Sequence, residues 1–268
     1  MPAPAGPEGQ HRRVERDMTM AKVLQGKAAL VVGGSRGIGA ATVRRLADDG
    51  ADVAFSYVAS GDAAAQLARD VSALGVRGIA LRADQADATE VAELVRSAHR
   101  HLGKLDILVI SAGVTALGDV GDPAADLAEF ERQFSINVRG VATAVRTAVP
   151  LLRDGGSIVA VGSVYGSRSP SSGLGDYSAS KAAVAAYTRA WARDLGSRAI
   201  TVNVVQPGPI DTDMNPATAP HAPALTAMTA LGRYGRADEV AAVIGFLSGP
   251  GGSYVSGATI NVDGGMLA

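Results

Sequence analysis

KAALVVGGSRGIGAATVRRLADDGADVAFSY, residues 27–57, is the stretch that decides the predicted fold. An apolar run at 27–34 is followed by a glycine-rich turn, an alanine-rich amphipathic segment at 38–49 and a second apolar run at 51–57. Near-continuous apolar runs of this length are typical of strands buried on both faces. The stretch therefore predicts a strand–helix–strand unit with two parallel strands.

The same alternation continues to the end of the chain. Further strands are predicted at 76–83, 105–113, 156–163, 199–208 and 258–265, and further helices at 62–74, 87–101, 126–152, 176–196 and 237–248. This order predicts an α/β fold, a Rossmann-type three-layer αβα sandwich around a central seven-stranded parallel sheet. We expect residues 23–268 to form one domain and residues 1–22 to be a disordered tail.

Composition and charge exclude several classes of function. The 268 residues carry 25 Lys and Arg against 26 Asp and Glu, so no net field favours nucleic acid or an anionic membrane as a partner. There is no cysteine, which excludes disulfides and thiolate ligands, and no apolar run suits a signal peptide or membrane span. His99, His101 and His221 lack further ligands at metal-binding spacing, so no metal site is expected. A cytoplasmic protein is the expectation.

One segment breaks the alternation. Residues 209–233, PIDTDMNPATAPHAPALTAMTALGR, follow the predicted strand at 199–208 and are rich in proline, with no strong hydrophobic period. Long irregular segments in compact domains usually have a function, and the carboxyl ends of parallel strands are where such sheets bind ligands. We predict that this segment is a substrate lid; a passive surface loop is the alternative.

The glycine-rich turn predicts a dinucleotide site. Gly33, Gly37 and Gly39 lie between the first strand and the first helix. Glycine there permits a tight turn and lets backbone amides approach a pyrophosphate. Ser35 and Ile38 belong to the same turn.

The end of the second strand indicates which dinucleotide is bound. NAD sites place a carboxylate there to bind the adenosine ribose, but FSYVASGD has none before Asp62. Ser56, Tyr57 and Ser60 lie at this position instead. Arg36, in the glycine turn, can bind a 2′-phosphate through charge-assisted hydrogen bonds. We therefore expect NADP(H) rather than NAD(H); the alternative is that Arg36 is merely solvated.

The segment after the third strand, RADQAD, offers a further contact. Asp84 can accept a hydrogen bond from the adenine amino group, and Gln85 is adjacent to it. Asp87, close by, has the competing interpretation of a helix N-cap.

A tyrosine and a lysine lie one turn apart in the predicted helix DYSASKAAVAAYTRAWARDL, residues 176–195. Because positions four apart lie on the same face of an α-helix, Tyr177 and Lys181 should point into the same space. A cation near a phenol makes the phenolate easier to form. The alternative is a half-buried tyrosine beside a solvated lysine.

Several short motifs together resemble one family. GGSRGIG (33–39), SAG (111–113), INV (136–138), GSV (162–164), YSASK (177–181), PGPIDT (207–212) and GATINVDGG (257–265) occur in the order found in the short-chain dehydrogenase/reductase family. The resemblance covers about residues 24–266 and is greatest to reductases of the 3-oxoacyl-thioester type.

The resemblance implies roles for particular residues. Ser163, Tyr177 and Lys181 would be catalytic, with Tyr177 giving a proton to a carbonyl oxygen that Ser163 holds. Asn137 would complete a proton relay through a water; its structural alternative is a backbone cap at a helix irregularity, and both can hold. The residues expected at the cofactor are Gly33, Ser35, Arg36, Gly37, Ile38, Gly39, Ser56, Tyr57, Ser60, Asp84, Gln85, Ser111, Ala112, Gly113, Tyr177, Lys181, Pro207, Gly208, Ile210 and Thr212. Those expected at the substrate are Ser163, Val164, Tyr165, Tyr177, Pro209 and Met214.

We therefore expect an NADPH-dependent reductase that converts a ketone or a 3-oxoacyl compound to an alcohol. In the family, the helices at 126–152 and 176–196 make subunit contacts, which implies a homotetramer or a dimer, although alanine is also simply a good helix former. VVQPGPIDTDMNP also resembles relatives described as cyclic-di-GMP-binding mediators of biofilm dispersal, so a ligand-sensing protein on the same fold is the alternative. A scaffold without a ligand would leave the glycine turn unexplained.

Overall fold

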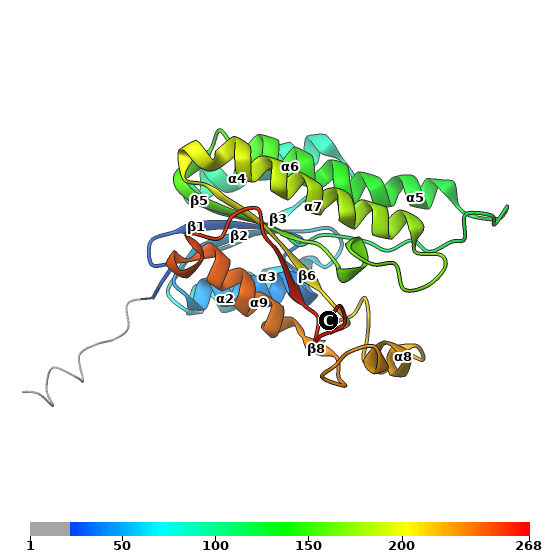
Figure 1. The fold of residues 1–268 in the computed structure, drawn as a ribbon. Coiled ribbons are helices and arrows are strands. Elements are labelled where there is room, and N and C mark those ends of the chain that lie inside the picture. Colours follow the sequence, from blue (N-terminus) through cyan, green and yellow to red (C-terminus); the bar gives the residue numbers. More distant parts are fainter. Residues whose placement is uncertain (1–21) are drawn as a thin grey trace, which may run out of the picture.

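A parallel β-sheet forms the centre of the computed structural model, which describes residues 22–268 (Figure 1). Its seven strands lie in the order β3-β2-β1-β4-β5-β6-β9. Their bounds are β1 Ala28–Val32, β2 Asp52–Tyr57, β3 Gly78–Arg82, β4 Leu105–Ile110, β5 Leu152–Val161, β6 Thr201–Pro207 and β9 Thr259–Val262. The predicted α/β sandwich with a seven-stranded parallel sheet is therefore confirmed.

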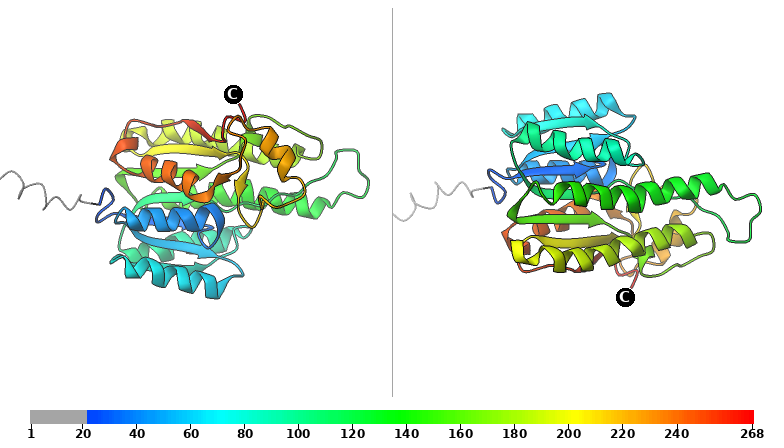
Figure 2. Two further views of the ribbon diagram at one scale, coloured as in Figure 1. Left: turned by 90° about the horizontal axis from the view of Figure 1, so that it is seen from below. Right: turned by 90° about the horizontal axis from the view of Figure 1, so that it is seen from above.

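Helices cover both faces of this sheet. One face is packed by α2 (Gly37–Asp48), α3 (Gly61–Ala73) and α9 (Ala237–Ser248). The other is packed by α4 (Ala88–Leu102), α6 (Val141–Ala148) and α7 (Gly175–Leu195), and α5 (Leu127–Phe134) precedes α6 and contacts α7. Figure 1 shows the two helical layers above and below the strands, and Figure 2 shows each layer from its own side.

The two outer strands are less buried than the sequence predicted. Every residue of β1 and β4 is buried, as expected for strands covered on both faces. Residues of β3 and β9, by contrast, are only partly buried or exposed. The expectation of burial on both faces is wrong for these two strands because they lie at the edges of the sheet, where one side has no neighbouring strand.

The long helix predicted at 126–152 is wrong in two respects. A π-helical turn, η1 (Ser135–Gly140), separates α5 from α6, and α6 ends at Ala148. Residues 149–151 form a turn, and residue 152 is already the first residue of β5. This strand carries a register irregularity where it pairs with β4. An alanine-rich pattern cannot reveal either feature, because a π turn needs one extra residue rather than a change in composition.

The segment at 209–233 contains short elements of its own. The two-residue strand β7 (Ile210–Asp211) pairs with β8 (Gly235–Arg236), and α8 (Ala222–Ala227) lies between them. The amide of Leu231 donates to the carbonyl of Gly264, which ties the segment to the turn after β9. Figure 1 places α8 at the end of the sheet where β6 finishes. Its function as a lid stays a prediction.

The tail predicted at 1–22 lies outside the described residues, except for Lys22, which packs against Gly50. Within residues 22–268 no helix is long and apolar enough to cross a membrane. The same residues contain no group of His, Asp and Glu side chains suited to hold a metal ion.

Candidate active site

The order of strands reverses between β1 and β4, which creates a crevice at their carboxyl ends. The predicted motifs meet at this edge. The glycine turn follows β1, SAG follows β4, GSV follows β5 and PGPIDT follows β6. Residues distant in the sequence are thus brought to one site by the topology of the sheet.

The glycine turn is a cradle that side chains would fill. Gly33 has a φ of +76°, and a Cβ there would lie 2.6 Å from atoms of Ala112. A Cβ at Gly39 would collide with the carbonyl of Gly33. Helix α2 starts directly after the turn without any side-chain cap, so its first amides face the crevice as donors for an anion. These residues fit a pyrophosphate.

Gly37 connects the two ends of the predicted cofactor site. Its φ is +52°, and a Cβ there would lie 3.3 Å from Cγ2 of Thr212. Thr212 belongs to PGPIDT, in which the amide of Gly208 donates to the carbonyl of Val262 and Ile210 is buried. The structure therefore brings together two motifs separated by the greater part of the chain.

The residues predicted at the adenosine end divide into two groups. Ser56 is buried, and its Oγ accepts a hydrogen bond of 2.8 Å from the amide of Gly33. It therefore supports the glycine turn from behind. Arg36 and Ser60 are exposed, and Tyr57 is half-buried at the end of β2. Arg36 is thus free to meet a phosphate at the mouth of the crevice.

The side chains of Asp84 and Gln85 both form hydrogen bonds within the protein. Burial would raise the pKa of Asp84, but the amide of Ala86 and the guanidinium of Arg132, 3.1 Å away, hold that pKa below its usual range. The Nε2 of Gln85 donates to the carbonyl of Ile136 in the π turn. The interpretation of Asp87 as an N-cap is confirmed, because its carboxylate accepts from the amides of Thr89 and Glu90.

Lys181 is buried rather than solvated. The residue is only 5% exposed, and its Nζ donates a hydrogen bond of 3.1 Å to the carbonyl of Val161 at the end of β5. The same Nζ lies 5.8 Å from the centre of the Tyr177 ring. The predicted pairing on one face of α7 is therefore present, and the alternative of a solvated lysine is wrong.

Gly113 leaves the room that this lysine occupies. A Cβ at Gly113 would lie 3.1 Å from Nζ of Lys181 and 3.4 Å from Oδ1 of Asn137. The preceding residues Ser111 and Ala112 both donate their amides to the carbonyl of Val32. The SAG motif thus places a glycine, which has no side chain, against both the ammonium of Lys181 and the side-chain amide of Asn137.

Asn137 lies in the π turn and is held at both ends of its side chain. Its Nδ2 donates to the carbonyl of Val114 and to Oγ of Ser180, and its Oδ1 accepts from the amide of Val114. Ser180 in turn donates to the carbonyl of Tyr177 over 2.7 Å. The predicted cap at a helix irregularity is present. Sequence reasoning missed Ser180, although it lies within YSASK, three residues after Tyr177.

Ser163 and Tyr165 complete the wall beside Tyr177. Ser163 is 7% exposed, and its Oγ accepts from the amide of Tyr165. The rings of Tyr165 and Tyr177 meet edge to face, with centres 6.3 Å apart. Burial raises the pKa of Tyr165, and the phenols of Tyr177 and Tyr234 add to the rise. Val164, predicted at the substrate, is instead buried in the protein at 2% exposed.

Tyr234 was not predicted from the sequence. Its phenol donates to Oδ1 of Asn215, which also lies 2.9 Å from Nε2 of His221. Of the two residues predicted from this segment, Pro209 is buried and Met214 is 54% exposed. Nothing in the residue pattern marks Tyr234, because it follows the segment and its contact with Asn215 forms only in the fold.

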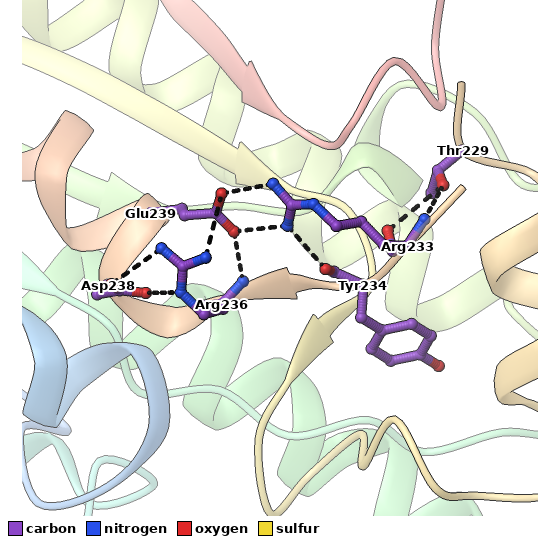
Figure 3. A network of polar contacts seen from close by, with 6 residues as sticks. All are labelled: Thr229, Arg233, Tyr234, Arg236, Asp238 and Glu239. Carbon is purple, nitrogen blue, oxygen red and sulfur yellow. Dashed lines mark hydrogen bonds and ion pairs between the residues drawn. The ribbon is translucent and has the colours of Figure 1, made fainter. Parts of the chain in front are cut away.

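An ion-pair network anchors Tyr234 (Figure 3). The guanidinium of Arg233 donates to both carboxylate oxygens of Glu239 and to the carbonyl of Tyr234. Arg233 and the amide of Arg236 together lower the pKa of Glu239 to about 2. The ring of Tyr234 points away from these charges (Figure 3). The network therefore fixes the end of the segment while leaving the ring for other contacts.

The fold and this cluster define a dinucleotide-binding oxidoreductase, and comparisons with known proteins give its family. Residues 32–267 match the family described as Enoyl-(Acyl carrier protein) reductase. The chain is 44% identical over 239 residues to the cyclic-di-GMP-binding biofilm dispersal mediator protein of Escherichia coli, covering 89% of this chain and 96% of that one. It is 40% identical over 250 residues to the 3-oxoacyl-(acyl-carrier-protein) reductase of Pseudomonas aeruginosa, covering 91% and 98%.

A solved structure is similar over nearly the whole length. The blue fluorescent protein from a metagenomic library, in complex with NADPH, has a TM-score of 0.90 and 46% identity, covering 92% of this chain and 100% of that one. The chain belongs to the short-chain dehydrogenase/reductase family of oxidoreductases. The resemblance seen in the motifs is therefore confirmed.

Proposed function

We propose that the protein is an NADP(H)-dependent reductase that converts a ketone or a 3-oxoacyl compound to an alcohol, with Tyr177 as the proton donor. The observation that carries this proposal is the buried ammonium of Lys181 beside the Tyr177 ring, next to Ser163 in the crevice of a dinucleotide-binding sheet. A protein that only binds a ligand has no need for an ammonium buried beside a phenol.

The residues of the crevice fit the cofactor. The glycine turn from Gly33 to Gly39 would hold the pyrophosphate, Arg36 the 2′-phosphate, and the backbone and hydroxyl of the Ile210–Thr212 segment the nicotinamide carboxamide. When bound, NADPH supplies the hydride. The NADPH complex of the metagenomic neighbour supports this choice of cofactor.

The residues of the chain would divide the remaining work. Ser163 Oγ donates a hydrogen bond to the carbonyl oxygen, and Tyr177 Oη gives that oxygen its proton. Lys181 stabilises the phenolate that remains, since a cation within about 4–6 Å favours the charged form of an acid. Asn137 Oδ1 has a second lone pair, which can hold a water for returning the proton to this cluster.

The test is a reductase assay on a panel of ketones, aldehydes and 3-oxoacyl thioesters with NADPH, using the protein and its Tyr177→Phe variant. We expect the variant to lose about 10²- to 10⁴-fold in kcat, the usual contribution of a positioned acid. Tyr187→Phe, on the same helix, is the matched control and should retain activity. Equal activity of the Tyr177→Phe protein would sink the mechanism.

The choice of cofactor has its own experiment. Arg36→Ala should raise the KM for NADPH far more than the KM for NADH, because only NADPH carries the 2′-phosphate. Arg100→Ala, in the last turn of α4 and paired with Glu93, removes a similar charge away from the glycine turn and should change neither. Equal losses for both cofactors in Arg36→Ala would refute the phosphate contact.

The alternative function is a cyclic-di-GMP-binding protein on the same fold. It is favoured by the 44% identity to the E. coli dispersal mediator. Calorimetry with cyclic-di-GMP, together with the reductase panel, separates the two. Binding without turnover on any substrate would replace the reductase with this alternative.

We also propose a homotetramer or a dimer formed through α5–α6 and α7. Support comes from the exposed alanines of α7, which are Ala179, Ala182, Ala186 and Ala190, and from the stacked rings of Tyr187 and Trp191 on the same helix, whose centres are 4.6 Å apart. Light scattering after size exclusion measures the mass directly. A single species of 27.1 kDa would contradict this assembly.

A further inference from the structure

One tyrosine lies directly beside the proton donor. The rings of Tyr165 and Tyr177 meet edge to face, with centres 6.3 Å apart. Tyr165 is only half-buried, whereas Tyr234 is 9% exposed and is held by Asn215 and by the Arg233–Glu239 ion pair. The ring of Tyr165 is therefore available as a wall for a substrate held at Tyr177.

The 209–233 segment, which begins directly after β6, exposes large apolar side chains. Met214, Met228 and Leu231 of the 209–233 segment are 54%, 37% and 65% exposed. Large apolar side chains that remain exposed in a segment over a ligand crevice indicate a surface for an apolar ligand. Methionine adapts its shape to irregular surfaces and makes favourable sulfur contacts with aromatic rings.

The charges near the crevice disfavour an anionic substrate. Residues 209–232 contain Asp211 and Asp213 but no lysine or arginine, and the next cation, Arg233, is paired with Glu239.

The stretch that follows the SAG motif is acidic as well. Residues 115–131 contain no lysine or arginine, and their carboxylates belong to Asp119, Asp122, Asp126, Glu129 and Glu131. A hollow of about 390 Å³ brings Asp119, Asp122 and Glu131 beside Asp176, the residue before Tyr177. Between Ser163 and Asp176 the only cation is Arg168. Negative charge on these two segments repels coenzyme A thioesters and acidic carrier proteins.

We infer that the substrate is an uncharged, flat aromatic ketone whose ring lies against Tyr165, and not the thioester of coenzyme A or of a carrier protein. The inference rests on the proposed reductase function. Hydride from NADPH adds to the carbonyl carbon, the C=O π bond breaks, and the proton of Tyr177 goes to the oxygen, leaving NADP⁺ and an alcohol. Tyr165 is then the residue that sets specificity.

The experiment compares three ketones with NADPH: 2-tetralone, which is flat and aromatic, cyclohexanone, its saturated counterpart, and acetoacetyl-coenzyme A, which is anionic. We expect kcat/KM to be highest for 2-tetralone. Tyr165→Leu should lower kcat/KM for 2-tetralone about tenfold, the worth of one good aromatic contact, and much less for cyclohexanone. Tyr165→Phe keeps the ring and should retain most of the preference.

Tyr254→Leu makes the same chemical change at a fully exposed tyrosine and is the matched control. A preference for acetoacetyl-coenzyme A, or an equal loss on 2-tetralone and cyclohexanone in Tyr165→Leu, would overturn the inference while leaving the reductase function intact. Absence of turnover on all three compounds and on the wider panel would overturn both.

A second measurement tests the role of charge. Asp119→Lys combined with Asp122→Lys should raise kcat/KM for acetoacetyl-coenzyme A several-fold at low ionic strength and change 2-tetralone much less. The gain should disappear at about 1 M salt, where the screening length falls to about 3 Å. If the double variant gives no gain at low salt, the electrostatic part of the inference is wrong.

Discussion

The catalytic cluster and the 209–233 segment differ in how their side chains are held. Lys181, Asn137 and Ser180 are buried, and each is hydrogen-bonded to groups on a strand, a helix or the π turn. The 209–233 segment exposes Met214 and Leu231, and it is held by the hydrogen bond from Leu231 to Gly264 and by the ion pair of Arg233 with Glu239. Under the proposed function, the groups that act on every substrate are fixed by regular structure, whereas the apolar side chains of the segment lie on a surface that can vary.

The largest effect is expected where the fold leaves no room at all. Gly33→Ala adds a methyl 2.6 Å from Ala112 and forces a side chain into a left-handed conformation. We expect a loss of about 2–4 kcal/mol in the free energy of unfolding and no measurable NADPH binding. Gly75 also has a positive φ, +84°, but a Cβ there meets nothing within 4 Å. Gly75→Ala therefore measures the loss of stability that comes from the backbone conformation alone. Equal losses in urea unfolding of the two variants would show that the close approach is unimportant.

A smaller change tests how precisely the cluster is placed. Gly113→Ala puts a methyl 3.1 Å from Nζ of Lys181, which must then move by a few tenths of an ångström. We expect kcat to fall about tenfold, less than the ~10²-fold that a displacement of 1 Å can cost, with little loss of stability. Gly175→Ala, where a Cβ meets nothing, is the control. An unchanged kcat in Gly113→Ala would mean that the lysine tolerates displacement.

Ser180 tests whether Tyr177 and Asn137 must be tied together. Ser180→Ala removes the bonds to the Tyr177 carbonyl and the Asn137 amide, so we expect kcat to fall several-fold with KM unchanged, and stability to fall by about 1 kcal/mol. Ser178→Ala is matched, because the described structure gives its Oγ no partner. A rise in KM instead of a fall in kcat would place Ser180 with substrate binding.

The smallest effect is expected at the anchor of the 209–233 segment. Glu239→Gln should raise KM and leave kcat nearly unchanged, with Glu129→Gln as control. The folded pKa of Glu239 is about 2 against an ordinary 4.5, so its contribution to stability is complete above pH 4.5 and is lost as the pH falls toward 2. The stability difference between the protein and Glu239→Gln should therefore shrink over that range. A difference that persists at pH 2 would contradict the ion pair as its origin.

The sequence predicted most of the fold because buried parallel strands leave continuous apolar runs, as β1 and β4 do. It predicted Tyr177 and Lys181 because helical spacing fixes which residues share a face. It could not predict that Ser56 supports the glycine turn or that Tyr234 donates to Asn215, since these contacts depend on how separate loops meet. Ser180 was within reach, because it lies in the same motif as Tyr177.

The π turn at Ser135–Gly140 makes the length of this region as important as its composition. Gln133 and Asn137 hold adjacent parts of one segment, accepting from the amides of Ala116 and Val114. A helix turns about 100° per residue, so deleting a single residue here would let the helix close into a regular α-helix and rotate one amide away from the other. Point substitutions can therefore accumulate along α5 and α6, but the spacing between these two residues cannot change. In this part of the chain, an insertion or deletion should disturb the positions of Gln133 and Asn137 more than a substitution does.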